Sequence, residues 1–176
     1  MSAVSELITE RLLMRGWREE DFEPWAAVLG DPLVARGLGQ NAGMPPIEAW
    51  RDMALMAGHW ALKGYGNWVL EERDSGELVG RAGLYYPPDW PEIEVGWTVA
   101  REHWGKGYAA EAGRAAAGWG AEQLGLRHIV SLIHPANERS IRVAQKLGEK
   151  LEGHLRLRGF DLLVYGTDLP LGDPAA

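Results

Sequence analysis

The sequence REHWGKGYAAEA, residues 101–112, decides the fold of this chain. It follows a strand-like run, residues 93–99, and leads into an alanine-rich segment, residues 109–123, that is typical of a helix. Glycines at such a junction leave backbone N–H groups bare, and the peptide dipoles of the helix add partial positive charge there. Together these groups make a cradle for an anion, most often phosphate. The stretch therefore predicts a site for a phosphorylated cofactor.

The composition bounds the class of protein. A chain of 176 residues with 46% apolar and 24% charged residues is typical of one soluble globular domain, which we place at residues 1–168. The Pro/Gly/Ala-rich end, residues 169–176, is expected to fray. No apolar run is long enough to span a membrane, and residues 1–10 lack the layout of a signal peptide, so a cytoplasmic location is expected.

The charge and the aromatic content of the chain limit the kinds of partner it can have. The formal net charge of -7 argues against a nucleic-acid partner and favours cationic ligands such as amines. The chain has no cysteine, which excludes disulfides and thiolate nucleophiles. Its nine tryptophans are expected in the core, in the wall of a pocket or in a homodimer contact.

The rest of the sequence predicts a mixed α/β fold of the α+β class. Apolar spacing predicts helices at residues 21–29, 46–63 and 109–123, and a fourth helix that Asn137 caps and Gly148 ends. Alternation and turn signals predict strands at residues 9–17, 68–72, 78–86, 93–99, 129–133, 151–157 and 160–165. The expected order is β-α-α-β-β-β-α-β-α-β-β, a mixed central sheet flanked by helices.

Several kinds of phosphate binder share the pattern Gly105-Lys106-Gly107. A Walker A loop does not fit, because Ala100 stands at its first glycine and no Ser or Thr follows Lys106 to hold magnesium. A dinucleotide fingerprint fits on spacing, but antiparallel-looking strands precede the loop and no acidic strand end for a ribose follows it. Glycines that serve only a tight turn are the third interpretation.

A second motif lies about 30 residues downstream, after the next strand: Asn137-x-x-Ser140, followed by Lys146-Leu147-Gly148. Alone it is a helix cap. With both motifs, the chain resembles the GNAT superfamily of N-acetyltransferases, in the RimJ/RimL-type branch of ribosomal-protein N-terminal acetyltransferases. The opening TERLLMR, residues 9–15, and WGKGYAAEA, residues 104–112, match that branch as well. The resemblance covers about residues 7–167 and implies the GNAT acyl-CoA N-acyltransferase fold.

The resemblance implies acetyl-CoA as the acyl donor, with roles for the matching residues. The strand that carries Trp97 and Val99 would splay from the next strand and pair with the pantetheine arm. Asn137 would hydrogen-bond the cofactor, and Ser140 would protonate the leaving thiolate. Consecutive backbone amides would hold the CoA pyrophosphate, those of Trp104, Gly105, Lys106, Gly107, Tyr108 and Ala109.

Two residues depart from the family's pattern. Glu102 stands in the place of Gln or Arg, and since an acid beside pyrophosphate repels it, Glu102 receives no binding role. Glu149 stands in the place of Phe, which puts local packing in question. Arg142 and Lys146, four apart on one helix face, are candidates for a CoA phosphate or for an ordinary solvated face.

The implied reaction moves an acetyl group from a thioester to an amine by direct attack in a ternary complex. A protonated amine cannot attack, so the site needs a base, and the carbonyl oxygen needs a donor such as a backbone N–H of the splayed strand. Glu94 is the first candidate base, with a solvated strand face as the alternative. Asp161 is the second; burial would raise its pKa, and the alternative is an ion pair with an arginine. His134 is the third, with a structural role as the alternative.

The acceptor is a protein N-terminus or a small-molecule amine. Tyr85, Tyr86, Trp90 and Trp97 line its pocket or belong to ordinary strand packing. No histidine spacing fits a metal site, so no metal is expected. The alternative functions are a non-catalytic acyl-CoA-binding or sensor module and a nicotinamide-dinucleotide binder.

Overall fold

In residues 4–172, the part of the chain that this computed structural model describes, eight strands form a mixed sheet in the order β1-β2-β3-β4-β5-β6-β8-β7. Strands β5 and β6 are parallel, and the other neighbours are antiparallel. The strands are β1 (Leu7–Ile8), β2 (Leu12–Arg15), β3 (Asn67–Glu72), β4 (Leu78–Tyr85), β5 (Glu94–Val99), β6 (His128–Ile133), β7 (Lys150–Leu157) and β8 (Phe160–Asp168).

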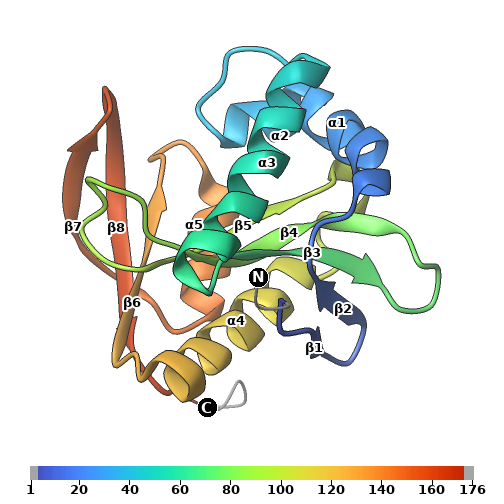
Figure 1. Cartoon of the computed structure of the whole chain (residues 1–176). Coiled ribbons are helices and arrows are strands. Elements are labelled where there is room, and N and C mark those ends of the chain that lie inside the picture. The colour runs from blue at the N-terminus through green and yellow to red at the C-terminus, as the bar shows by residue number, and fades with distance from the viewer. Residues whose placement is uncertain (1–3, 173–176) are drawn as a thin grey trace.

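Helices cover both faces of the sheet. Figure 1 shows α1, α2 and α3 on one side and α4 on the opposite side. None of the helices in the described part of the chain is long and apolar enough to cross a membrane. The helices are α1 (Phe22–Gly30), α2 (Pro32–Gly37), α3 (Pro46–Lys63), α4 (Tyr108–Leu124) and α5 (Glu138–Lys146).

Helix α4 packs closely on the sheet because its inner face is made of small residues. Ala112, Ala116 and Ala117 are fully buried and share one core with side chains of β3, β4 and β5. A Cβ on Gly113 would come within 2.9 Å of the Leu147 side chain, so a larger residue there would displace Leu147 at the end of α5. Close packing of α4 sets its N-terminus beside the end of β5, where the candidate site lies.

The predicted mixed fold is confirmed, with one helix matching residue for residue. The helix predicted at residues 46–63 is α3, and Gly64 ends it in the left-handed region at φ 76°. The structure adds two short elements. Strand β1 has two residues, and α2 is capped by Asp31, whose Oδ1 accepts a hydrogen bond from Leu33 N at 2.7 Å. Apolar periodicity cannot reveal elements this short, although the pair Asp31-Pro32 is a helix-start signal.

Residues 169–172, the described part of the tail that the sequence predicts to fray, contact the rest of the domain. Leu169 N donates to Arg127 O at 2.8 Å, and the side chains of Leu169 and Leu171 pack against the main core. Arg114 Nη1 donates to Gly172 O at 2.8 Å. The remainder of that prediction, residues 173–176, lies outside the described residues.

Strands β5 and β6 separate almost as soon as they meet. Glu94 and Val130 are their register pair in the described chain, and Val130 N donates to Ile93 O at 3.2 Å. Beyond that pair, Trp97 and Val99 have register partners on β4 alone. The separation opens one edge of β5 in the middle of the sheet.

Candidate functional site

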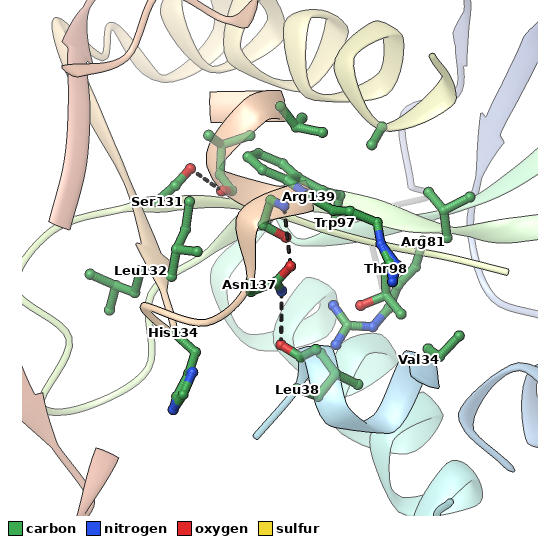
Figure 2. A pocket seen from close by; sticks show the side chains of 18 of the residues that line it. Val34, Leu38, Arg81, Trp97, Thr98, Ser131, Leu132, His134, Asn137 and Arg139 are labelled. Atoms are coloured by element: carbon green, nitrogen blue, oxygen red, sulfur yellow. Dashed lines mark hydrogen bonds between the residues drawn. The ribbon is translucent and has the colours of Figure 1, made fainter. Parts of the chain in front are cut away.

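A cleft of about 900 Å³ lies where β5 and β6 separate. Figure 2 shows side chains from β5, β6, α5 and α2 around one space. Lys106 alone among the predicted cofactor-binding residues does not line the cleft. Those that line it are Trp97, Val99, Trp104, Gly105, Gly107, Tyr108, Ala109, Asn137 and Ser140.

The junction between β5 and α4 leaves backbone N–H groups free. Gly105 and Gly107 have φ angles of 79° and 89°, a region where a residue with a Cβ is strained. Glu111 N donates to Gly107 O at 3.1 Å, so the amides of residues 108–110 have no partner within the helix. A Cβ on Gly105 would meet no atom within 4 Å, so the space beside this backbone is open. The residues present therefore fit a diphosphate at the start of α4.

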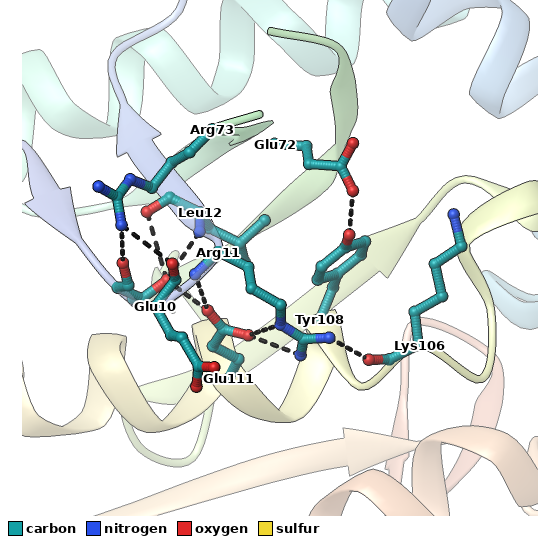
Figure 3. Close-up of polar contacts among 9 residues, drawn as sticks. Glu10, Arg11, Leu12, Glu72, Arg73, Lys106, Tyr108 and Glu111 are labelled. Atoms are coloured by element: carbon teal, nitrogen blue, oxygen red, sulfur yellow. Dashed lines mark hydrogen bonds and ion pairs between the residues drawn. The ribbon is translucent and has the colours of Figure 1, made fainter. Parts of the chain in front are cut away.

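An ion pair supports this junction from the N-terminal strands (Figure 3). Glu111 Oε1 accepts hydrogen bonds from Thr9 Oγ1 at 2.6 Å and Arg11 N at 2.8 Å. Glu111 Oε2 accepts from Arg11 Nε at 2.8 Å and lies 2.7 Å from Nη2. Arg11 Nη1 donates to Lys106 O at 2.7 Å. The TER motif and the glutamate of WGKGYAAEA, which sequence analysis matched without interpreting, together fasten the loop to the helix.

The side chains of Tyr108 and Lys106 have partners of their own within the fold. The Tyr108 hydroxyl donates to Glu72 on β3 (Figure 3). Lys106 Nζ lies 3.1 Å from His103 Nδ1. Glu102 is exposed and does not line the cleft, in line with its having no binding role.

A cationic wall faces the cleft from α5. Arg139 lies over the Trp104 ring, with 3.7 Å between the guanidinium carbon and the ring centroid, a cation–π contact. Trp104 Nε1 donates to Val99 O at 2.8 Å, which holds the ring against the end of β5. Arg142 and Lys146 line the same cleft and add positive charge where phosphates would lie, although Arg142 Nη1 also lies 3.4 Å from Glu138 Oε2, a carboxylate that lines the cleft too.

Asn137 uses both ends of its amide within the fold. Its Oδ1 accepts from Ser140 N at 3.2 Å and caps α5, while its Nδ2 donates to Gly37 O at 3.1 Å and ties α5 to the end of α2. Nδ2 carries two hydrogens, so its bond to Gly37 O leaves one donor for a cofactor. Asn137 thus has a structural role that is independent of any ligand.

Glu94 is a carboxyl group with a raised pKa. It lines the cleft at the start of β5, and its Oε2 accepts from Trp90 Nε1 at 2.6 Å. Its Oε1 accepts from Leu132 N at 3.4 Å. Burial raises the pKa of Glu94 to about 7, against the opposing effects of these two hydrogen bonds and of Arg81. An acid of this strength gains and loses a proton readily at neutral pH.

The other two candidate bases are placed less favourably. Asp161 is not buried: its side chain is 76% exposed, its Oδ1 lies 3.6 Å from Arg156 Nη1, and it does not line the cleft. The contact with an arginine, its alternative interpretation, is the one observed. His134 lines the cleft, where its Nδ1 accepts from Ala136 N at 3.2 Å. No group of three or more His, Cys, Asp or Glu side chains in residues 4–172 is arranged to hold a metal ion.

The part of the cleft near Glu94 contains polar residues that sequence analysis missed. Arg81 Nη1 donates to Asn67 Oδ1 at 2.7 Å, and its Nη2 donates to Asp52 Oδ1 at 3.3 Å. These three residues come from β4, β3 and α3, and no local pattern connects them. Tyr85 and Trp90, two of the aromatic candidates, line the cleft with their rings in edge contact at 5.3 Å.

Tyr86, the remaining aromatic candidate, packs into the core instead. Its ring contacts the main hydrophobic cluster, and its backbone N donates to His59 Nε2 at 3.1 Å. Burial lowers the pKa of His59, so this histidine is a neutral structural residue.

The free N–H groups at the start of α4, beside the split between β5 and β6, fit the resemblance that the sequence motifs indicate. Residues 11–150 match the family model described as an acetyltransferase (GNAT) domain. The chain belongs to this family, and it is an acetyltransferase with the GNAT fold.

Two similar proteins support this membership along the whole domain. The Bacillus subtilis (strain 168) protein YkkB is 31% identical over 175 residues, which cover 94% of this chain and 96% of YkkB. The crystal structure of an acetyltransferase from Agrobacterium tumefaciens str. C58 is 31% identical with a TM-score of 0.83, covering 95% of this chain and 96% of that one.

Membership of the family does not establish the RimJ/RimL branch. The structure of Mycobacterium smegmatis RimJ in complex with CoA-disulfide has a TM-score of 0.73 and covers 94% of this chain and 88% of that one. Its sequence identity is 19%, a level at which the likeness shows the fold alone.

Proposed function

We propose that this acetyltransferase moves the acetyl group of acetyl-CoA to a primary amine by direct attack in a ternary complex. One observation carries the proposal: Glu94, an acid with a pKa of about 7, lies in the same cleft as the free N–H groups at the start of α4. GNAT acetyltransferases use acetyl-CoA and act on amine acceptors.

The donor would bind along the open edge of β5. The amides of Gly105 and of residues 107–109 would hold the diphosphate, since those of Trp104 and Lys106 donate to Arg101 O and His103 O. The cationic wall of α5 would add charge for the phosphates. The backbone of Trp97 and Val99 would pair with the amides of the pantetheine arm, as an added strand does. Bound there, acetyl-CoA supplies an acyl group activated as a thioester.

Glu94 would take the proton that the acceptor amine must lose. Near pH 7 a large share of Glu94 is ionised, and Trp90 Nε1 holds its Oε2 in a fixed direction. A base whose pKa lies near the operating pH is the most effective in proton transfer. The amine, once neutral, is free to attack the acyl carbon.

Two further groups would meet the charges that develop during attack. A backbone N–H of β5 near Trp97 would donate to the acyl oxygen as it becomes negative. Ser140, which lines the cleft on the first turn of α5, would donate its hydroxyl proton to the departing thiolate and take in its place the proton that the attacking nitrogen releases. Asn137 sets the position of Ser140, because its Oδ1 accepts from Ser140 N.

The acceptor would enter beside Tyr85, Trp90, Asp52 and Arg81. The charges of Asp52 and Arg81 cancel in an ion pair, so these two residues do not add to the negative charge of the whole chain. A protein N-terminus and a small-molecule amine both remain acceptors for the test below. The function of RimJ/RimL-type proteins makes ribosomal-protein N-termini part of the panel.

The experiment is to measure thiol release from acetyl-CoA with a colorimetric disulfide reagent, against amines, amino acids and short peptides. The chain contains no cysteine, so the protein adds no thiol background. A thermal-shift measurement with CoA accompanies it, because a ligand that binds only the folded state raises the melting temperature.

Release that depends on one acceptor supports the transfer reaction and identifies the acceptor class. Stabilisation by CoA without release from any acceptor favours the acyl-CoA sensor, the second candidate function. Stabilisation by nicotinamide dinucleotide in place of CoA overturns both.

A further inference from the structure

The carboxyl group of Glu149 is buried behind the cleft with an incomplete set of partners. Its residue is 3% exposed, and it follows directly on the Lys146-Leu147-Gly148 segment at the end of α5. Its Oε1 lies 3.0 Å from Ser131 Oγ on β6. Its Oε2 is buried without a hydrogen-bond partner among the described residues. A buried, half-satisfied carboxylate is costly, so the neutral acid is the favoured form.

Ser131 gives an independent argument for that neutral form. Its Oγ lies 2.8 Å from Val95 O and 3.0 Å from Glu149 Oε1. A serine hydroxyl carries one proton, whereas a backbone carbonyl and an ionised carboxylate both only accept. Both contacts are satisfied when Glu149 holds a proton and donates it to Ser131 Oγ, while Ser131 donates to Val95 O.

The bond to Val95 O lies at the place where β5 leaves β6. Glu94 and Val130 are the register pair of these strands, so Val95 is the next residue of β5 after the pairing ends. The carbonyl of Val95 accepts a hydrogen bond from the Ser131 side chain of β6. If the two strands stayed paired, a backbone N–H of β6 would donate to this carbonyl. Two residues further along, Trp97 borders the cleft. The Ser131 bond therefore sets where the open edge of β5 begins.

We propose that Glu149 is a positioning residue: as a neutral acid it holds the Ser131 hydroxyl toward Val95 O and so fixes the edge of β5 that receives the acyl-CoA. This inference rests on the proposed function for what occupies the cleft. When Glu149 ionises, the hydroxyl turns to the carboxylate, Val95 O loses its donor and the edge of β5 loosens. CoA affinity then falls at high pH.

The groups that face Glu149 favour the neutral acid on balance. Glu94 on β5 and Glu152 on β7 each raise the pKa of Glu149, and His128 on β6 lowers it. Burial is the largest effect, and it raises the pKa of Glu149 to about 8, although the hydrogen bond that Ser131 would donate to the ionised form opposes it. The proposed switch therefore lies just above neutral pH.

The first test needs no ligand. An infrared difference spectrum between the wild type and Glu149→Gln reports the carboxyl stretch of Glu149 itself. We expect the band of a protonated acid at pH 6 and its loss above about pH 8. A carboxylate signature already present at pH 6 overturns the inference, whatever the protein binds.

The second test is the dissociation constant of CoA from pH 6 to pH 9.5, by calorimetry. In the wild type we expect it to rise about fivefold across the upper part of this range, the value of one hydrogen bond. Glu149→Gln keeps a donor toward Ser131 at every pH, so its curve lacks this rise. Ser131→Ala shows the weaker affinity already at pH 7. Glu152→Gln on β7 removes a charge that raises the pKa of Glu149, so it should move the rise to lower pH without abolishing it.

The outcomes separate this inference from the proposed function. Curves for the wild type and Glu149→Gln that coincide at every pH overturn the positioning role even when CoA binds well. Absence of CoA binding in the wild type overturns the proposed function, and the infrared spectrum then decides the protonation of Glu149 independently. Circular dichroism and melting temperatures of all variants exclude loss of fold as the cause.

Discussion

Arg11 and Glu111 form an ion pair that joins the turn between β1 and β2 to the first turn of α4, with 2.7 Å between Arg11 Nη2 and Glu111 Oε2. The same guanidinium donates to Lys106 O in the loop before the helix. Arg11 thereby holds the loop and the helix at fixed positions relative to each other. A cradle whose N–H groups are already in place binds its ligand without the cost of ordering them.

Replacing Arg11 by Gln should therefore weaken CoA binding. We expect the dissociation constant to rise about fivefold, since ordering the loop costs about 1 kcal/mol. Arg73→Gln is the matched control. Arg73 Nη1 donates to Thr9 O and Glu10 O of the same turn but touches neither α4 nor the loop. The measurement is a calorimetric titration with CoA. If both variants lose the same affinity for CoA, Arg11 acts through stability alone.

Replacing Glu94 by Gln should lower kcat by about a hundredfold or more, because the site loses its general base. The KM for acetyl-CoA should change little, since the cradle is untouched. In the wild type, kcat/KM should increase as pH rises through about 7, where Glu94 ionises. The pH profile is measured by initial-rate thiol release with the acceptor that the panel identifies.

Asp161→Asn is the matched control for Glu94, because it removes a carboxylate that is exposed and does not line the cleft. Its activity should equal that of the wild type. A large loss in Asp161→Asn with little effect in Glu94→Gln would reverse the assignment of the base.

A methyl group on Gly105 should disturb the cradle more than the fold. Gly105 has a φ of 79°, and an alanine in this region costs about 1 kcal/mol of stability. Its Cβ would project into the open space beside the free N–H groups. Gly125, at the other end of α4, has a φ of 65° and open space as well, so Gly125→Ala carries the same backbone cost far from the cradle.

The melting temperature should decrease by a similar amount in both alanine variants, whereas the affinity for CoA should decrease only in Gly105→Ala. The measurements are thermal unfolding with and without CoA. Equal CoA affinity in the two variants would remove Gly105 from the proposed diphosphate site.

Features that depend on neighbouring residues were predictable from the sequence. Gly64 ends α3, Asn137 caps α5, and Gly105 and Gly107 make the loop before α4, because each acts on its own stretch of backbone. The GNAT motifs are built from such positions, so the fold and the position of the loop before α4 could be predicted from them.

Features made by contacts between distant segments were not predictable. Asp52, Asn67 and Arg81 meet only after α3 packs beside β3 and β4, and the sequence marks none of them. Glu149 stood out as unusual, yet its partner Ser131 lies on another strand. Asp161 shows the opposite error. Its apolar neighbours suggested burial, but it lies at the start of β8 beside the edge strand β7, and Phe160 next to it is itself 41% exposed.

The stability of the wild type relative to Glu149→Gln should fall as pH rises from about 5 to about 8. The pKa of Glu149 is about 8 in the folded protein and has an ordinary value of 4.5 when the chain is unfolded. Between these values the folded state binds one proton more than the unfolded state, so raising the pH favours unfolding. The slope of the difference should approach about 1.4 kcal/mol per pH unit and vanish outside that window.

Urea unfolding of both proteins at a series of pH values measures this difference directly. Subtracting the two curves cancels the carboxylates and histidines that the proteins share, so the remainder belongs to Glu149 and to groups coupled with it, Glu94 foremost. A difference that is flat from pH 5 to pH 8 would mean that Glu149 is already ionised in the folded protein. It would then have to sit in its buried position as a charge with Ser131 as its sole hydrogen-bond donor, and the bond from Ser131 to Val95 O would be lost at neutral pH.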